Sequence, residues 1–500
     1  MNKAKCIVDK DYVIAEVDPR LYGSFIEHLG RAVYSGIYEP DHPAADEQGF
    51  RQDVIGLVKE LGVPIVRYPG GNFVSGYNWT DGIGPKHLRP RRLDYAWQSV
   101  ESNQVGIDEF VDWCKKAGTK PMAAVNLGTG TPQEAGYMME YCNYPAGTYW
   151  SDLRIRNGHK DPHNIKVWCL GNEMDGPWQT CSLSAEDYGK KARETAKILK
   201  WIDPAAELVV CGSASPWMPS YPEWDRVVLE HTYEQADYIS LHRYYENEEN
   251  IENFLASFAD MDAFIRTVAA AADYVKAKTR SKKVMKLSFD EWNVWYIKKQ
   301  TRVPWAEAPA ILEDQYSLLD ALVFGGMLCT LLNHCDRVRM ACLAQLVNVI
   351  APIFTEKGGR VLKQATYYPF QQVSAYGRGT ALKTLTTSEK VETGLYGEVP
   401  ALQTAATYNE TDGSVTVFVL NSHRTENSEF TVDLRSFGHA TMLEHSIMDG
   451  PDLFAQNTFE APFTVMPHTR PAGEGAAPFT VKLPKLSWNV LRFSVAKAGL

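Results

Sequence analysis

Two glutamates each follow a short apolar run that is typical of a buried strand. Glu173 comes after the run at 165–170, and Glu291 comes after the run at 284–289. In a parallel α/β barrel the carboxyl ends of distant strands meet at one rim, so these two side chains can face each other. A facing pair of carboxyl groups can hydrolyse a glycosidic bond, one acting as general acid and the other as nucleophile or base. The pair therefore predicts glycoside hydrolysis.

Polar residues also occur at other predicted strand ends. They are Glu27 with His28, Arg67, the Gly70-Gly71-Asn72 segment, Asn126, and His242-Arg243-Tyr244. Taken singly, His242 also fits a core histidine, Arg67 an ion-pair partner below the site, and the glycine pair a simple turn. Their common position on one rim favours a site that hydrogen-bonds sugar hydroxyls and tunes the pKa values of the two glutamates.

Other chemistries have little support in the sequence. The His159-x-x-x-His163 spacing lies in a polar loop with Pro162, where no predicted helix holds both rings on one face, so we expect no metal. The sequence contains no G-x-S-x-G or G-x-x-x-x-G-K-[ST] motif, so serine hydrolysis and nucleotide chemistry lack a motif. We therefore expect no cofactor.

Alternating strand-like and helix-like runs from Leu21 onward predict the scaffold that holds these residues. The strand-like runs are 22–26, 64–68, 120–127, 165–170, 208–211, 238–241, 284–289 and 338–343. The helix-like runs are 50–61, 107–117, 131–141, 184–202, 223–234, 251–278 and 312–332. Thr131-Pro132-Gln133-Glu134 and Ser184-Ala185-Glu186-Asp187 mark two helix starts. Eight strands in βα alternation predict an α/β fold, a (β/α)8 TIM barrel.

The segment 70–106 is a long predicted loop after the second strand. It is rich in aromatic residues, with Tyr77, Trp79, Tyr95 and Trp97. Long loops at the C-terminal face of a barrel usually build a binding site or an interface.

The two ends of the chain have a different, β-rich pattern. Residues 1–17 alternate apolar and polar side chains, whereas 383–500 contain short β-rich runs between turn signals such as Thr411-Asp412-Gly413 and Gly473-Glu474-Gly475. We therefore expect a catalytic barrel at 18–382 and a C-terminal β-sandwich domain at 383–500 that also takes in the N-terminal strands.

Composition narrows the classes of partner. The 500 residues are 45% hydrophobic and 22% charged, with a net charge of −10 and no cluster of Lys and Arg, so we expect no nucleic acid. The apolar stretch near 321–332 is too short for a membrane span, and charged residues at 9–11 interrupt any signal peptide, so we expect no membrane partner. Nine cysteines, several in apolar contexts, are typical of free thiols in a reducing cytoplasm.

Several motifs together resemble the family 51 glycoside hydrolases, the intracellular α-L-arabinofuranosidases. The matching segments are 25–30 (F-I-E-H-L-G), 66–73 (V-R-Y-P-G-G-N-F), 168–173 (W-C-L-G-N-E), 289–293 (F-D-E-W-N) and 344–348 (A-Q-L-V-N). The resemblance covers nearly the whole chain. It implies a barrel with the acid/base after the fourth strand and the nucleophile after the seventh.

The resemblance also implies roles for individual residues. Glu173 corresponds to the acid/base and Glu291 to the nucleophile. The residues that resemble ligands of the furanose hydroxyls are Glu27, Asn72, Asn172 and Gln345. His242 and Tyr244 resemble supports of the nucleophile, with Arg67 near it, and Trp97 and Trp295 resemble aromatic walls of the glycone or leaving-group pocket.

By this resemblance we expect a retaining, exo-acting, cytoplasmic α-L-arabinofuranosidase that is a homohexamer. Its substrate would be an arabinose-containing oligosaccharide from arabinan or arabinoxylan, and its intermediate a covalent glycosyl-enzyme. β-Xylosidase or endo-glucanase activity on the same scaffold stays open, as does the preference among leaving groups. A non-catalytic sugar-binding protein is a further alternative, which the presence of both Glu173 and Glu291 disfavours.

Overall fold

The computed structural model describes residues 2–297, 304–470 and 478–495. Its larger part is a closed barrel. The barrel strands are β2 (Gly23–Phe25), β3 (Ile65–Tyr68), β6 (Lys120–Val125), β7 (Val167–Leu170), β8 (Glu207–Val210), β9 (Tyr238–Tyr245), β10 (Lys286–Val294) and β11 (Val338–Ala344). All neighbours are parallel, and the order around the barrel is β10-β11-β2-β3-β6-β7-β8-β9. The predicted (β/α)8 barrel is confirmed.

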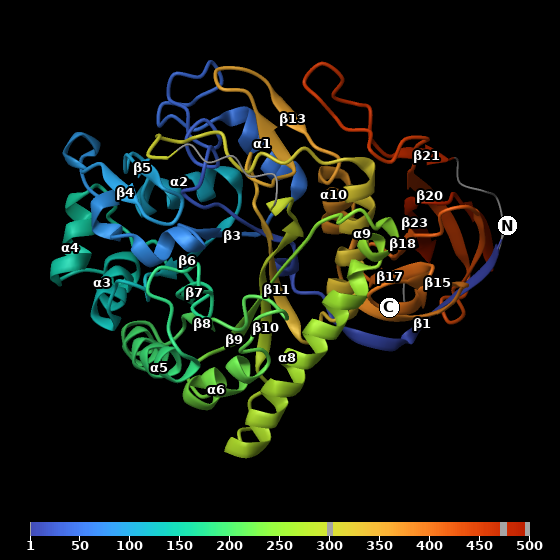
Figure 1. Cartoon of the computed structure of the whole chain (residues 1–500), viewed down its shortest axis with the longest axis horizontal. Helices are drawn as coiled ribbons and strands as arrows, with labels where there is room; N and C mark the ends of the chain where they lie inside the picture. The colour runs from blue at the N-terminus through green and yellow to red at the C-terminus, as the bar shows by residue number, and fades with distance from the viewer. Residues whose placement is uncertain (1, 298–303, 471–477, 496–500) are drawn as a thin grey trace.

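Helices cover the outside of the barrel (Figure 1). They are α1 (Gln52–Leu61), α2 (Ile107–Ala117), α3 (Pro132–Asn143), α4 (Tyr149–Arg156), α5 (Ala185–Ile202), α6 (Glu223–Thr232), α7 (Ile251–Leu255), α8 (Ser257–Thr279), α9 (Leu318–Asn333) and α10 (Tyr367–Tyr376). Short 3-10 turns lie at Pro19–Tyr22, Asn72–Gly76, Trp79–Gly82 and Lys86–Leu88. Both predicted helix starts are confirmed, since Thr131 caps α3 and Ser184 caps α5 through their side-chain oxygens.

Two predicted helices differ from the observed ones. The run at 251–278 forms α7 and α8, which are separated at Ala256, where the backbone leaves helical geometry. The run at 312–332 becomes helical only at Leu318, because the side chain of Ser317 accepts from the Asp320 amide while the Asp320 carboxylate accepts from the Ser317 amide. In both segments the helical spacing of apolar residues extends across the point where the helix is interrupted or has not yet begun. This spacing alone therefore did not predict the observed ends.

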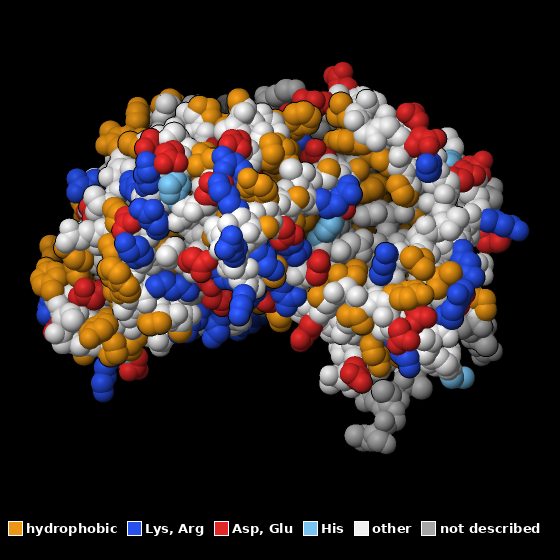
Figure 2. All heavy atoms as spheres, turned by 90° about the horizontal axis from the view of Figure 1, so that it is seen from below, with side chains coloured by type: hydrophobic (Ala, Val, Ile, Leu, Met, Phe, Trp, Pro, Cys, Tyr) orange, Lys and Arg blue, Asp and Glu red, His pale blue; other side chains and the backbone are white. Residues whose placement is uncertain are grey.

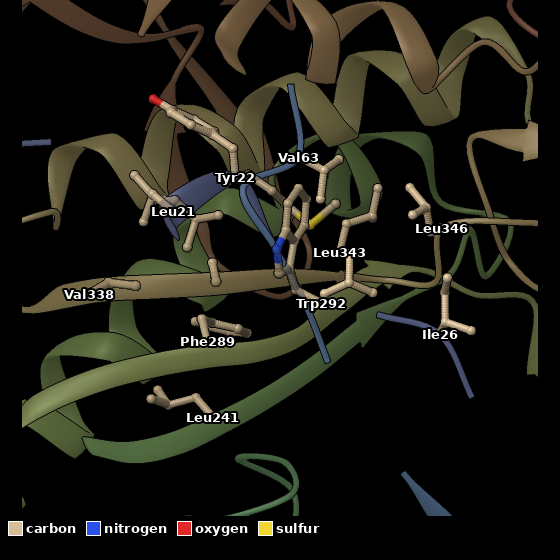
Figure 3. Packing of buried hydrophobic residues seen from close by; sticks show 14 of the residues in the cluster. Leu21, Tyr22, Ile26, Val63, Leu241, Phe289, Trp292, Val338, Leu343 and Leu346 are labelled. Carbon is tan, nitrogen blue, oxygen red and sulfur yellow. The ribbon is translucent and has the colours of Figure 1, made fainter. Parts of the chain in front are cut away.

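The barrel strands alternate between two hydrophobic layers. In β7, Val167 and Cys169 face the barrel interior, whereas Trp168 and Leu170 pack outward against the helices. The outer layer is built from bulky side chains, and Figure 3 shows Trp292 of β10 packed among them. The interior layer near the C-terminal rim contains small residues such as Ala124, Cys169, Cys342 and Ala344.

The second domain is one nine-stranded sheet with the order β21-β20-β23-β18-β17-β14-β1-β19-β22. Its strands are β1 (Asn2–Glu16), β14 (Thr380–Thr387), β17 (Leu402–Asn409), β18 (Ser414–Asn421), β19 (Ser428–Asp433), β20 (Ala440–Met448), β21 (His468–Arg470), β22 (Phe479–Leu483) and β23 (Ser487–Val495). Apolar residues from both ends of this sheet share one core, so the sheet curls around it.

The N-terminal strand β1 lies inside this sheet, antiparallel to β14 and parallel to β19. The predicted turn at Thr411-Asp412-Gly413 joins β17 to β18, with Gly413 at φ +68°. The predicted turn at 473–475 lies outside the described residues. Division of the chain at residues 17 and 382 stays a prediction.

Short two-stranded pairs complete the fold. They are β4 (Arg92–Asp94) with β5 (Ser99–Glu101), β12 (Ile353–Thr355) with β13 (Val361–Lys363), and β15 (Lys390–Thr393) with β16 (Gly397–Pro400). The first pair lies within the long aromatic loop. In Figure 2 the two domains form two lobes, and Lys and Arg side chains lie among Asp and Glu side chains over this face.

Helix α9 joins the barrel to the sheet domain. Every residue from Leu318 to Leu332 is buried, and the helix contacts β14, β17, β18 and β23 (Figure 1). A Cβ added at Gly325 would overlap the indole of Trp488, which is fully buried and donates a hydrogen bond to Gln372 at 2.9 Å. Within the described residues no helix is both long and apolar enough to cross a membrane.

We predict that Gly325→Ala destabilises the protein. Although alanine favours helix formation by about 1 kcal/mol, the overlap with Trp488 should cost more, about 1–3 kcal/mol, so that the thermal unfolding midpoint falls. The matched control is Gly56→Ala on the exposed face of helix α1, where nothing lies within 4 Å of the added Cβ and the midpoint should rise slightly. Equal midpoint shifts in the two variants would contradict this account of the domain contact.

Candidate active site

A break in the strand alternation of β10 brings two consecutive carboxylates into the barrel. The outward residues Phe289 and Trp292 are three positions apart instead of two, and the ladders to β9 and β11 shift register at this point. Asp290 and Glu291 therefore both face inward, and both are buried. Glu291 therefore lies within β10, which continues to Val294, and the prediction that it follows the end of the strand is wrong.

Glu291 is held by a cation and a phenol. Arg67 of β3 donates to its Oε1 atom at 2.6 Å, and the hydroxyl of Tyr244 donates to its Oε2 atom at 2.8 Å. Burial raises the pKa of Glu291, while the positive charges of His242 and Arg67 oppose that rise. Arg67 also donates to Asn172 Oδ1 at 2.6 Å, which ties the end of β7 to the same cation.

His242 connects three carboxylates. Its Nδ1 atom lies 2.9 Å from Glu173 Oε1 and 3.5 Å from Glu291 Oε2, and its Nε2 atom lies 2.9 Å from Asp290 Oδ1. Burial lowers the pKa of His242, but Glu291, Asp290 and Glu173 together raise it to about 10. The ring is therefore an imidazolium at neutral pH. His242 lies within β9, opposite Glu291, and not beyond a strand end as predicted.

Glu173 stands in the loop after β7 with a φ of +41°. Besides the contact with His242, its Oε2 atom accepts a hydrogen bond from the indole N–H of Trp178 at 2.6 Å. Glu173, His242 and Glu291 each offer one ligand atom, and these atoms lie within 4.8 Å of one another. The carboxyl groups of Glu173 and Glu291 thus face each other across a short gap, as the sequence predicted.

Glu27 forms the opposite wall. Its Oε1 atom accepts from the Phe73 amide at 2.8 Å and from the Trp97 indole at 3.0 Å, and its own amide donates to Gln345 Oε1 at 3.0 Å. Burial raises the pKa of Glu27 to about 8. A Cβ added at Gly71 would lie 3.0 Å from Glu291 Oε1 and 3.3 Å from Glu27 Oε2, so the backbone at this position fills the space between the two carboxylates.

The remaining predicted residues lie around this centre. Asn172 approaches Asn72 at 3.5 Å, and the ring of Trp295 meets that of Tyr244 edge-on with 5.0 Å between centroids. Asn126 instead bonds within its own loop and to the Tyr77 carbonyl. His28 lies one layer behind the site, 2.8 Å from Glu101 and 2.7 Å from the hydroxyl of Tyr68.

Two residues of the site, Asp290 and Trp178, were not predicted from the sequence. Asp290 adjoins Glu291, but regular strand alternation would send one of the two outward, so only the bulge reveals the second carboxylate. Trp178 follows Glu173 by five positions in the same loop, where an aromatic residue near a catalytic candidate was the available signal.

Two groups of side chains have ligand types that metals accept. In the first, Glu173, His242 and Glu291, the carboxylates raise the pKa of His242 to about 10, so a metal ion would have to displace a proton from the ring. In the second, His163 Nε2 lies 2.7 Å from Asp108 Oδ1, and His159 Nε2 lies 3.7 Å from Asp108 Oδ2. Asp108 already accepts from the hydroxyl of Tyr141 at 2.7 Å, so these contacts suffice to explain its burial.

Comparisons with known families, sequences and structures point to the same kind of protein along 98% or more of the chain. Residues 57–255 match the family described as "Alpha-L-arabinofuranosidase 1 domain", and residues 290–487 match "Alpha-L-arabinofuranosidase C-terminal domain". The chain is 54% identical to an intracellular exo-α-(1→5)-L-arabinofuranosidase of Halalkalibacterium halodurans, over 98% of both chains. It is 53% identical to a protein with the same description from Bacillus subtilis, over 98% of this chain and 99% of that one.

A solved structure of a family 51 α-L-arabinofuranosidase from Bifidobacterium longum superposes with a TM-score of 0.96. That protein is 44% identical to this chain, and the superposition covers 99% of this chain and 100% of the other.

We predict that Glu27→Gln reduces the loss of stability at alkaline pH. Because the pKa of Glu27 rises from 4.5 to about 8 on folding, its contribution to stability is complete below pH 4.5 and disappears as pH rises through about 8. The amide cannot ionise, so the fall in unfolding midpoint between about pH 5 and about pH 9 should be smaller in the variant.

The control for this measurement is Glu47→Gln, at a side chain that is 84% exposed. It should show the same fall as the wild type. A fall of wild-type size in Glu27→Gln would mean that this carboxyl group is not the one that titrates.

Proposed function

Because this chain belongs to the family 51 α-L-arabinofuranosidases, we propose that it hydrolyses terminal, non-reducing α-L-arabinofuranosyl residues of arabino-oligosaccharides. The two relatives at 54% and 53% identity are named intracellular exo-α-(1→5)-L-arabinofuranosidases, so a (1→5)-linked chain is the proposed substrate.

The short gap between Glu173 and Glu291 carries the proposed mechanism. One oxygen of each carboxyl group lies within 4.8 Å of the other. Enzymes that retain anomeric configuration place their carboxyl groups about 5–5.5 Å apart, whereas inverting enzymes need about 6.5–9.5 Å to admit a water molecule. The geometry therefore supports double displacement through a covalent glycosyl-enzyme.

In the first step, Glu291 attacks the anomeric carbon of the terminal arabinofuranose. Its negative charge is oriented by Arg67 and by the hydroxyl of Tyr244. Glu173 gives its proton to the glycosidic oxygen as the bond to the leaving group breaks, so the leaving sugar departs as an alcohol. An ester between Glu291 and the sugar remains.

In the second step, Glu173 accepts a proton from a water molecule that attacks the same carbon. The ester bond breaks, the carboxylate of Glu291 is restored, and arabinose leaves with its original configuration. Throughout, His242 stays within 2.9 Å of Glu173 and Asp290 as a fixed positive charge. It stabilises the carboxylate form of whichever glutamate is ionised.

The walls of the pocket supply groups for the sugar hydroxyls. We assign Glu27, Asn72, Asn172 and Gln345 to the hydroxyls of the terminal furanose, and Trp97 and Trp295 to its flanks. A neutral Glu27, with its raised pKa, both donates and accepts hydrogen bonds, which suits a hydroxyl.

We predict different losses for the two catalytic glutamates. Glu291→Ala should abolish turnover of every arabinofuranoside, because no covalent intermediate forms. Glu173→Ala should lower kcat/KM on arabinobiose by about 10²–10⁴-fold, yet spare the first step with p-nitrophenyl α-L-arabinofuranoside, whose leaving group needs no proton. A rapid burst of p-nitrophenolate followed by slow turnover should result.

Proton NMR of the wild-type reaction should show that the anomeric configuration is retained. Glu460→Ala, at a side chain 79% exposed, is the control for substitution of a glutamate. Inversion, or equal losses on both substrates in both variants, would contradict the assigned roles. No release of arabinose by folded wild type, with hydrolysis of the xyloside or a glucan instead, would favour the alternative specificities.

We also propose that the protein is a cytoplasmic homohexamer. The relatives are named intracellular, and the hexamer rests on the family resemblance. All nine cysteines are free, and eight of them are buried, which suits a reducing compartment. Sedimentation equilibrium should give a mass six times that of one chain, and a monomer mass at micromolar concentration would refute the hexamer.

A further inference from the structure

A cavity of about 350 Å³ lies next to the catalytic pocket, and we call it the side pocket. Its inner wall is shared with the catalytic centre. Tyr244, whose hydroxyl donates to Glu291 at 2.8 Å, lines it, and so does Trp295, whose ring lies against that of Tyr244. A ligand in the side pocket would therefore lie one side chain away from the nucleophile.

The second wall comes from the loop after β8 and from β9. Trp217 is 69% exposed, and the guanidinium of Arg243 lies 5.9 Å from its ring centroid. Arg243 is fixed by Asp260 at 2.7 Å and by the Tyr244 carbonyl at 2.8 Å. The guanidinium, whose charge is neutralised by Asp260, therefore supports the indole of Trp217. Most of the indole surface stays exposed, so a ligand can stack on it.

The third wall belongs to the other domain. Leu395 and Tyr396, in the turn between β15 and β16, line the side pocket. Asn253 of α7 accepts a hydrogen bond from the Leu395 amide at 3.0 Å, and Arg424 pairs with Glu252 on the same helix. These contacts hold the turn against the barrel, so the sheet domain completes a cavity beside the active site.

The lining favours a neutral carbohydrate. Aromatic faces pack on the C–H faces of sugar rings, and the amides of Asn250 and Asn253 are suited to hydroxyl groups. Glu246 and Glu248 also line the cavity, which disfavours a phosphate or another anion.

Starting from the proposed function, we propose that the side pocket binds an arabinofuranosyl unit of the leaving-group chain, beyond the unit that is joined to the scissile bond. A disaccharide substrate does not reach it, whereas a trisaccharide does. The pocket therefore makes the enzyme prefer longer arabino-oligosaccharides.

The test compares arabinotriose with arabinobiose in the wild type, Trp217→Ala and Tyr396→Ala. We expect the ratio of kcat/KM for the triose to kcat/KM for the biose to fall about tenfold in both variants, since a tryptophan or tyrosine anchor contributes strongly to binding. Trp201→Ala removes an equally exposed tryptophan from α5, at 74% exposure, and should leave the ratio unchanged.

Binding is measured in parallel by calorimetry in the Glu291→Ala background, so that the result does not depend on turnover. Tighter binding of the triose than of the biose, lost on adding Tyr396→Ala, supports the side pocket. Equal affinities, or a ratio that both variants leave unchanged, overturn it.

Absence of hydrolysis by the wild type, together with a triose preference in binding, would overturn the proposed function and leave the side pocket supported. Hydrolysis of the aryl arabinofuranoside with no triose preference would support the proposed function and overturn the side pocket.

Discussion

The contact of His242 with three buried carboxylates is the interaction on which the site depends. Removing an ion from water costs several kcal/mol, and Glu173, Asp290 and Glu291 meet this cost only because two cations, His242 and Arg67, lie among them. Two positive charges face three carboxyl groups. The cluster is therefore neutral when one of the three carboxyl groups keeps its proton. The proposed pairing of a general acid with a nucleophile requires one protonated carboxyl group beside an ionised one.

The backbone brings these charges together through register. In β9, regular alternation sends Ser240, His242 and Tyr244 inward, opposite the bulge of β10 that sends Asp290 and Glu291 inward as consecutive residues. Without the bulge, one of these carboxylates would face the hydrophobic layer around Trp292, where it would have no counter-ion. The bulge thus places both carboxylates in the barrel interior while it keeps Trp292 in the outer hydrophobic layer.

The sequence predicted the barrel because hydrophobic periodicity determines it, and it predicted the rim because polar residues interrupt that periodicity at one end of each strand. It could not predict the extension of β10 to Val294, because a bulge depends on pairing with β9 and β11, which a single strand does not encode. It also gave no means of finding Leu395 and Tyr396 near the active site, since their approach depends on docking between domains. Asn126 was expected at the site but bonds to the Tyr77 carbonyl instead. A position at a strand end does not by itself direct a side chain into the site.

The arrangement of the walls also accounts for the proposed exo action, in which only a chain end reacts. The centre is surrounded by Glu27 after β2, Arg67 of β3, Asn172 after β7, Tyr244 of β9 and Gln345 after β11. A groove for an internal sugar would need a gap between two neighbouring walls, yet hydrogen bonds join Glu27 to Gln345 and Arg67 to Asn172. The backbone at Gly71 fills the space between Glu27 and Glu291. In the proposed mechanism the substrate chain therefore leaves between Asn172 and Tyr244, past Glu173 and toward the side pocket that Tyr244 lines.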